Sequence, residues 1–160
     1  MDKSIEQDDL IMIEPEDCQA YQMPEGLLLI GRSDPFVSQG FFDISPEMTV
    51  PKRSRPVDGL FKQITGKAIL KVYDGSVVKE EKALEQGQSF RIEANQEYSI
   101  ANPSQARSVV YWRFDGDITP ILDKMRKELP ALPEKARQKS GYKELFEEYQ
   151  KRMQEKQGDR

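Results

Sequence analysis

The fold is decided by the segment GQSFRIEANQEYSIAN, residues 87–102, in which two short runs with apolar side chains flank a turn. Residues 89–92 and 97–101 mix apolar and polar side chains in the manner of half-buried strands. Residues 94–96 lie between them and contain Asn95, a residue type that favours turns. The segment therefore predicts two strands of a β-rich domain joined by a short turn.

The same alternation of short strands and turns continues on both sides of this segment. Asp74-Gly75 is a strong hairpin signal, and Ser45-Pro46 and Asn102-Pro103 end other apolar runs. Short strands at this spacing predict a mostly β domain, either a sandwich or a closed barrel. The expected strands are residues 26–32, 40–44, 60–65, 68–73 and 108–114, with 18–23 as an edge strand or loop and 76–84 as a paired strand or loop.

The pattern changes to helices after the last of these strands. Thr119 and Pro120 predict a helix over 119–129, with the threonine as N-cap and the proline at the first helical position. Residues 134–157 predict a second, highly charged helix whose apolar side chains fall on one narrow face. That face consists of Tyr142, Leu145, Phe146, Tyr149 and Met153.

Composition limits the classes of function. The chain has 160 residues, a net charge of −4 and no histidine, and this charge gives no general attraction to nucleic acid or to an anionic membrane. The single cysteine, Cys18, excludes an intramolecular disulfide. No apolar run reaches the roughly 18 residues that span a bilayer, and residues 1–10 lack an apolar signal core. We therefore expect an intracellular, cytoplasmic protein without a membrane partner.

The spacing within residues 87–102 resembles the second sequence motif of the cupin superfamily, whose members fold as a double-stranded β-helix, or jelly-roll barrel. Gly87 and Asn102 match the glycine and the asparagine of that motif, and Tyr98 stands at the position of its metal-binding histidine. Tyr98 either hydrogen-bonds a ligand at the barrel mouth or fills the space left by the metal. The resemblance covers about residues 26–115 and implies a cupin barrel.

The first cupin motif is matched in spacing but not in metal ligands. Arg53 and Arg55 fall at its two histidine positions, Gly59 at its glutamate and Gly66 at its closing glycine. Cupin metals are held by imidazole nitrogens and a carboxylate, whereas a guanidinium stays protonated and has no lone pair to offer. We therefore predict neither a metal nor another cofactor in this barrel.

Two interpretations of the arginines stay open. Side chains two apart on a strand point to the same face, so Arg53 and Arg55 would bind a carboxylate, sulfate or phosphate if that face is the barrel interior, with Lys62 adding positive potential. In the second interpretation, PKRSRP (51–56) is a loop bounded by prolines, and its arginines are solvated or pair with an acidic neighbour such as Asp58.

Catalysis without a metal has few candidates in this sequence. Cys18 lies outside both motifs in an acidic setting that does not favour a thiolate, so we do not expect it to act as a nucleophile. General acid–base chemistry needs a tunable side chain near the substrate. Without histidine, the candidates for this role are Asp43, Asp58, Tyr73, Glu93, Tyr98 and Lys62, and we name none of them as catalytic.

A second, weaker resemblance points to the C-terminal cupin of centromere protein C. It rests on residues 84–112, including Asn95 and Tyr98, which are atypical of metal cupins. That module is metal-free, and the resemblance implies homodimerisation through the barrel. Its arginine-rich nucleosome-binding motif precedes the cupin, whereas Arg53 and Arg55 lie inside the expected barrel, so we do not expect binding to nucleosomes or to nucleic acid.

Together these patterns predict an N-terminal arm over 1–25, a cupin-type barrel over 26–117 and a C-terminal helical extension over 118–160. We expect a non-catalytic homodimer that serves as a binding or assembly module, since pairing between protomers would protect the sheet edges. The alternatives are a sensor of small anionic ligands and a metal-independent enzyme such as an isomerase. The apolar face of the second helix either binds a protein partner or rests on its own barrel. The residues expected to meet that partner are Tyr142, Phe146, Tyr149 and Met153.

Overall fold

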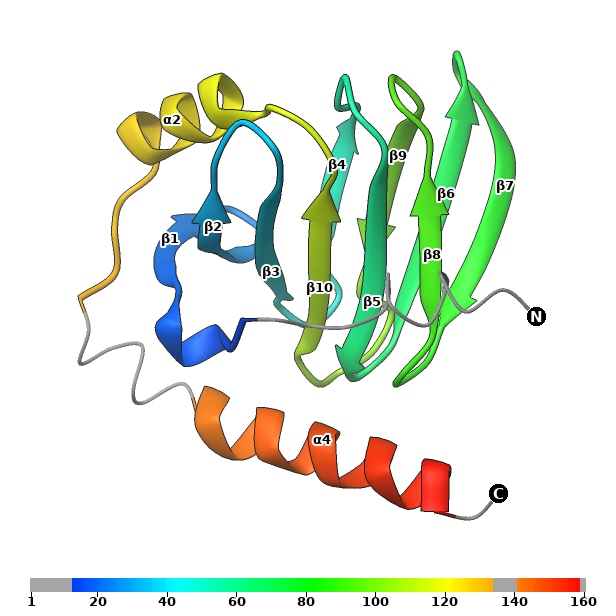
Figure 1. Cartoon of the computed structure of the whole chain (residues 1–160). Coiled ribbons are helices and arrows are strands. Elements are labelled where there is room, and N and C mark those ends of the chain that lie inside the picture. Colours follow the sequence, from blue (N-terminus) through cyan, green and yellow to red (C-terminus); the bar gives the residue numbers. More distant parts are fainter. Residues whose placement is uncertain (1–12, 134–140, 159–160) are drawn as a thin grey trace.

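The computed structural model describes residues 13–133 and 141–158 and consists mainly of short strands. Figure 1 labels each element. The strands are β1 (Gln19–Met23), β2 (Gly26–Ser33), β3 (Ser38–Ile44), β4 (Thr49–Arg53), β5 (Gly59–Thr65), β6 (Ala68–Asp74), β7 (Val77–Leu84), β8 (Ser89–Ile92), β9 (Glu97–Ala101) and β10 (Ser108–Phe114). The helices are the short 3-10 helix η1 (Pro15–Asp17), α2 (Thr119–Glu128) and α4 (Tyr142–Gly158).

The strands form two facing sheets of antiparallel pairs. One sheet has six strands in the order β1-β2-β3-β10-β5-β8, and the other has four in the order β4-β9-β6-β7. Helix α2 lies near one end of the strands and α4 near the other (Figure 1). Tyr142 and Tyr149 of α4 pack with Phe41 and Tyr111 of the six-stranded sheet. This is the mostly β jelly roll with a helical extension that the sequence predicts.

The six-stranded sheet is buried on both faces, which explains why β3 and β10 are buried at every position. Phe42, Phe61 and Trp112 face the other sheet and belong to the main core. Phe41 and Tyr111 alternate with them and belong to a second core outside the sheet. Successive side chains on a strand point to opposite faces, so two cores require the nearly continuous apolar runs seen in these strands.

The segment 18–23, expected as an edge strand or loop, forms the edge strand β1, which pairs with β2 along its whole length. The start of α2 differs from the sequence prediction. The predicted N-cap of α2 is wrong by one residue, since the cap is Ile118 and no side chain bonds to it. The Thr119 hydroxyl donates instead to Asp117 Oδ1 at 2.6 Å, and this local bond replaces the expected cap.

The retained motif residues have structural roles. Gly66 and Gly87 have φ values of +74° and +88°, a left-handed conformation that favours glycine. The buried side chain of Asn102 donates through Nδ2 to the carbonyls of Ile44, Ser45 and Ala106, at 3.0, 3.2 and 2.7 Å. These contacts join the β9–β10 connection to the end of β3, so Asn102 stabilises the fold.

The outer strands of both sheets carry features that oppose pairing with another chain. Residues 130–132 cover β1 through backbone hydrogen bonds of 2.8 Å at Gln22 and Ala20. Strand β4 contains Pro51, which has no N–H to donate, and β8 has four residues. Strand β7 has a charged run over 79–82 and a register shift against β6. Proline, short strands, charges and bulges all protect sheet edges.

None of the described helices is long and apolar enough to cross a membrane. The cytoplasmic location stays a prediction.

Candidate functional site

Both arginines of the first motif line a cavity between the sheets, beneath α2. Arg53 is the last residue of β4, and Arg55 lies in the loop that leads to β5. The cavity has a volume of about 10 Å³, which is roughly the space that one water molecule needs. Tyr98 of β9 and Trp112 of β10 also line it, together with the apolar side chains of Leu28, Phe42, Phe114, Ile118, Leu122 and Met125.

The two arginines differ in their partners. The Arg53 guanidinium lies 3.8 Å from a carboxylate oxygen of Glu25, which is buried. Arg55 Nη1 donates to the carbonyl of Ser54 at 2.9 Å, and Nη2 lies 4.0 Å from Met125 Sδ. Burial lowers the pKa of Arg55, the nearby Tyr98 opposes this shift, and Arg53 adds to it. Among the described residues Arg55 has no carboxylate partner, although a guanidinium keeps its charge in proteins.

Tyr98 fills the position of the missing histidine. It is 1% exposed, and its ring lies 4.9 Å from that of Phe61 between centroids. Burial raises the pKa of Tyr98, and the positive charges of Arg55 and Arg53 act in the opposite direction. Its hydroxyl finds no hydrogen-bond partner in the described part of the chain, and neither does Trp112 Nε1. The Tyr98 ring therefore packs in the core, while its buried hydroxyl group has no acceptor among the described residues.

The donor set of this cavity does not fit a metal. Gly59, at the glutamate position, supplies no side chain, and a Cβ there would lie 2.6 Å from two atoms of the Phe114 ring. Among the described residues there is also no group of three His, Cys, Asp or Glu side chains that could hold a metal ion. At the histidine positions of the two cupin motifs, this chain has hydrogen-bond donors instead: the guanidinium groups of Arg53 and Arg55 and the Tyr98 hydroxyl, while the Trp112 indole lines the same cavity.

Other sequence-predicted candidates lie away from the cavity. Lys62 is opposite Tyr111 in the β5–β10 register, on the outer face of the six-stranded sheet, so it does not join the arginines. Asp58 accepts a hydrogen bond from the Ala94 amide at 2.8 Å, whereas the carboxylate beside Arg53 is that of Glu25. The Tyr73 hydroxyl bonds to Ser99 Oγ at 2.8 Å in the four-stranded sheet.

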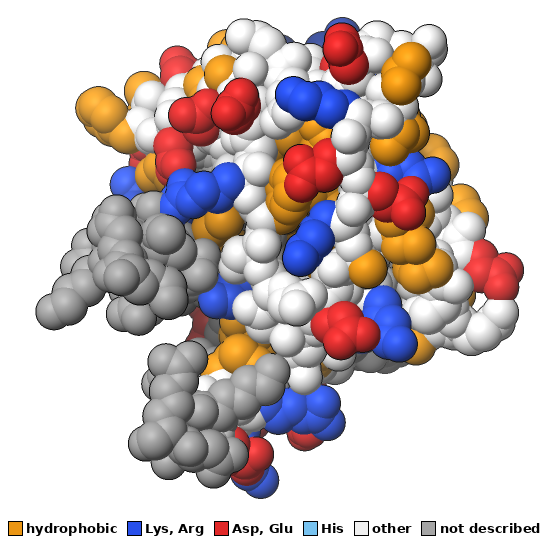
Figure 2. Space-filling model, turned by 90° about the vertical axis from the view of Figure 1, so that its right-hand side faces the viewer, with side chains coloured by type: hydrophobic (Ala, Val, Ile, Leu, Met, Phe, Trp, Pro, Cys, Tyr) orange, Lys and Arg blue, Asp and Glu red, His pale blue; other side chains and the backbone are white. Residues whose placement is uncertain are grey.

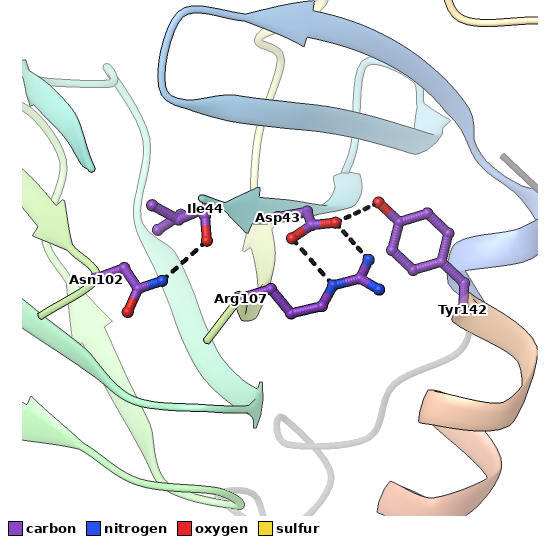
Figure 3. A network of polar contacts seen from close by, with 5 residues as sticks. All are labelled: Asp43, Ile44, Asn102, Arg107 and Tyr142. Atoms are coloured by element: carbon purple, nitrogen blue, oxygen red, sulfur yellow. Dashed lines mark hydrogen bonds and ion pairs between the residues drawn. The ribbon is translucent and has the colours of Figure 1, made fainter. Parts of the chain in front are cut away.

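Sequence reasoning missed a polar cluster on the outer face of β3. Arg107 donates to the Asp43 carboxylate through two nitrogens, and the Tyr142 hydroxyl donates to Asp43 Oδ2 at 2.6 Å (Figure 3). The Arg107 guanidinium carbon lies 4.8 Å from the centre of the Tyr142 ring. Burial, and next the charge of Asp43, raise the pKa of the Tyr142 hydroxyl. The cluster joins the start of α4 to the sheet.

The apolar face of α4 rests on its own barrel, the second of the two interpretations of that helix. Tyr142 and Tyr149 are buried in the outer core, and Leu145 and Met153 pack against it. The side chain of Phe146 lies outside the described part of the structure. A protein partner at this face stays a prediction, and such a partner would have to displace contacts that the chain makes with itself.

No protein-family model matches the chain, and no curated protein matches it. Solved structures do match. Oxalate decarboxylase from Bacillus subtilis has a TM-score of 0.59 at 11% identity, over 75% of this chain and 32% of that chain. Vicilin from Solanum lycopersicum has a TM-score of 0.58 at 12% identity, over 67% and 33%. A cupin superfamily protein from Desulfitobacterium hafniense has a TM-score of 0.50 at 16% identity, over 60% and 82%.

These similarities show that the chain folds as a jelly-roll barrel. The fold is that of a cupin, and this confirms the fold that the two cupin-like motifs predict. The chain spans about a third of the length of oxalate decarboxylase and of vicilin, and at such low identity the likeness concerns the fold alone. The weaker resemblance to centromere protein C stays a prediction.

Proposed function

We propose that this chain is a non-catalytic, metal-free binding module of the cupin fold, whose barrel receives a small anion. The observation that carries the proposal is the Arg55 guanidinium, which has no carboxylate partner among the described residues and lines the same cavity as the unpartnered Tyr98 hydroxyl. A partly desolvated charge without a counter-ion is costly, and so is a buried donor without an acceptor. A bound anion would supply both the opposite charge and the acceptor oxygens.

The residues of the cavity favour binding over catalysis. Proton abstraction from a substrate needs a side chain that accepts a proton near neutral pH. Arginine cannot, and burial raises the pKa of Tyr98, so its hydroxyl stays protonated. Asp43, Asp58 and Tyr73, which the sequence offered as acids or bases, bond elsewhere. The metal-independent isomerase therefore has less support than the binding module.

The homodimer remains part of the proposal, although the edge pairing expected from the sequence has little support. Charged side chains are interleaved with hydrophobic ones on the side of the molecule formed by β6, β7 and β8 (Figure 2). The exposed apolar residues near the start of β7 are Val77 at 65% and Val78 at 43%. A dimer would more readily use the outer face of the four-stranded sheet, because α4 covers that of the other sheet.

Thermal unfolding of the full chain tests the anion site. Sodium chloride, sodium acetate and sodium sulfate are compared at equal ionic strength. A ligand present at 100 times its Kd adds about 2.7 kcal/mol to the free energy of unfolding, so binding should be visible as a rise in Tm. We expect at least one anion to raise Tm in a saturable way and Arg55→Met to abolish the rise. Arg32→Ala is the matched control, because Arg32 is an exposed arginine paired with Asp34 at 2.8 Å. An unchanged Tm with every anion, or the same rise in Arg55→Met, would sink the proposal.

Sedimentation velocity at tens of micromolar tests the dimer separately. A two-fold mass supports it, and a monomer over the whole concentration range removes the dimer while leaving the anion site intact.

A further inference from the structure

We infer that the ligand of this barrel is a monocarboxylate with an apolar tail, whose carboxylate meets Arg55 and Tyr98 and whose tail lies against α2. The inference rests on the proposed anion site and names the chemical class of its ligand.

The charges around the cavity set the charge of the ligand. Arg53 and Glu25 form a partly buried pair at 3.8 Å and neutralise each other. Arg55 then leaves one positive charge without a partner among the described side chains. A monoanion balances this charge, whereas a phosphate or sulfate dianion would leave an excess negative charge between apolar walls. Burying an unpaired charge is unfavourable, so the site favours a monoanion.

The donors at this site favour a carboxylate among monoanions. A guanidinium presents a planar fork of N–H donors that matches the two oxygens of a carboxylate. The Tyr98 hydroxyl is a further donor that lacks a partner among the described residues, and Trp112 Nε1 is another in the same cavity wall. A carboxylate has about four lone-pair positions, enough to accept from Arg55 and Tyr98 together.

The walls of the cavity favour an apolar tail. Leu28, Phe42 and Phe114 line it from the barrel, and Leu122 and Met125 line it from α2. The space of about 10 Å³ holds no alkyl chain in this structure. A tail therefore requires one wall to move.

Helix α2 is the wall that we expect to move. It lies as a single layer near the ends of β2 and β3, and Leu122 is its one buried residue. Met125, which lies 4.0 Å from the Arg55 guanidinium, is half-buried. Displacing Met125 and Leu122 opens the space next to the charged group without disturbing the sheets.

The fluorescence of Trp112, the one tryptophan of the chain, reports on the cavity that it lines. The full chain is titrated with acetate, butyrate, hexanoate, hexanamide and adipate. Each buried methylene contributes about 0.8 kcal/mol, so affinity should rise about fourfold per methylene from acetate to hexanoate. Hexanamide, which is neutral, and adipate, which carries a second charge in place of the apolar end, should bind at least tenfold more weakly than hexanoate.

Two variants locate the carboxylate and the tail. Tyr98→Phe should weaken hexanoate binding about tenfold, because it removes a hydrogen bond to a charged group. Met125→Phe should weaken hexanoate more than acetate, because it enlarges a residue in the tail wall. Lys124→Ala, on the exposed side of α2, is the control and should leave both affinities unchanged.

The outcomes separate this inference from the proposed function. Arg55-dependent binding of chloride or acetate with no gain from longer chains overturns the monocarboxylate inference and leaves the anion site standing. Hexanoate binding that is indifferent to both Tyr98→Phe and Met125→Phe also overturns it. No binding of any anion overturns both.

Discussion

Gly59 stands where a metal cupin has its glutamate, and we predict that even an alanine at this position destabilises the protein. A Cβ there lies 2.6 Å from two atoms of the Phe114 ring and 3.0 Å from the Arg113 carbonyl oxygen. The Phe114 ring is itself 2% exposed and packs edge-on against Phe61, with centroids 6.0 Å apart. Overpacking a filled core costs about 1–3 kcal/mol, so Gly59→Ala should lower the free energy of unfolding by about 2 kcal/mol.

Urea unfolding followed by circular dichroism measures this cost, and for a chain of this size Tm should fall by about 4–8 °C. The control is the same substitution in a Phe114→Leu background, where the ring that meets the new methyl group is gone. Contacting residues couple by about 0.5–3 kcal/mol, so the alanine should cost less there. A Gly59→Ala protein within 0.5 kcal/mol of the parent, or an equal cost in both backgrounds, would refute the claim that the Phe114 ring fills the space next to Gly59.

Further predictions concern the polar contacts and the buried tyrosines. Tyr142→Phe should lower the free energy of unfolding by about 1.5–3 kcal/mol, because its hydroxyl donates to a charged carboxylate. Tyr73→Phe, which breaks a neutral hydroxyl pair, should cost about 0.5–1.5 kcal/mol in the same urea experiment, and equal costs would contradict the role of charge. Asn102→Ala should cost about 3 kcal/mol, because three backbone carbonyls lose their donor; a cost below 1 kcal/mol in urea would count against it. Burial raises the pKa of Tyr111 to about 12 and also raises the pKa of Tyr98. The folded-state pKa values then exceed the unfolded value of about 10, so stability is complete below pH 10 and falls as the pH rises toward 12. In urea titrations across this range, Tyr111→Phe should make that fall shallower by about 1.4 kcal/mol per pH unit, and an unchanged slope would contradict it.

The parts of the fold that local sequence specifies could be predicted. Gly66 and Gly87 adopt left-handed conformations at turns, and such positions leave a mark in sequence because few other residues tolerate them. The strands between the turns follow from period-two patterning. The spacing of both motifs therefore identified the cupin barrel and put Arg53, Arg55 and Tyr98 at the histidine positions of the motifs, but it left open whether the two arginines face the barrel interior.

The placement of Lys62 depended on which face of β5 points inward, and sequence alone did not settle it. Both faces of the six-stranded sheet are buried, so alternation no longer separates inside from outside. Gly59 could be assigned to the barrel by motif spacing, but Lys62 was grouped with the arginines only by its charge. It lies on the opposite face, across from Tyr111.

The polar partners escaped prediction for a different reason. Glu25 pairs with Arg53 from a distant part of the chain, and Asp43 meets Tyr142 across 99 positions of sequence. No local pattern encodes such pairs, since they depend on how the sheets and α4 pack. The apolar face of α4 was visible in sequence, but a stripe on a helix does not say whether its own sheet or another chain will cover it.

We propose that this barrel of cupin fold has a site with one positive charge where the cupin motifs place a metal ion. A thermal-unfolding titration of the full chain with manganese(II) chloride, against sodium chloride of equal chloride concentration, separates the two kinds of site. We expect Tm in manganese(II) chloride to equal Tm in the sodium salt. A saturable rise with manganese(II) that disappears in Tyr98→Phe would contradict it, because it would place a metal ion among the donors of the barrel.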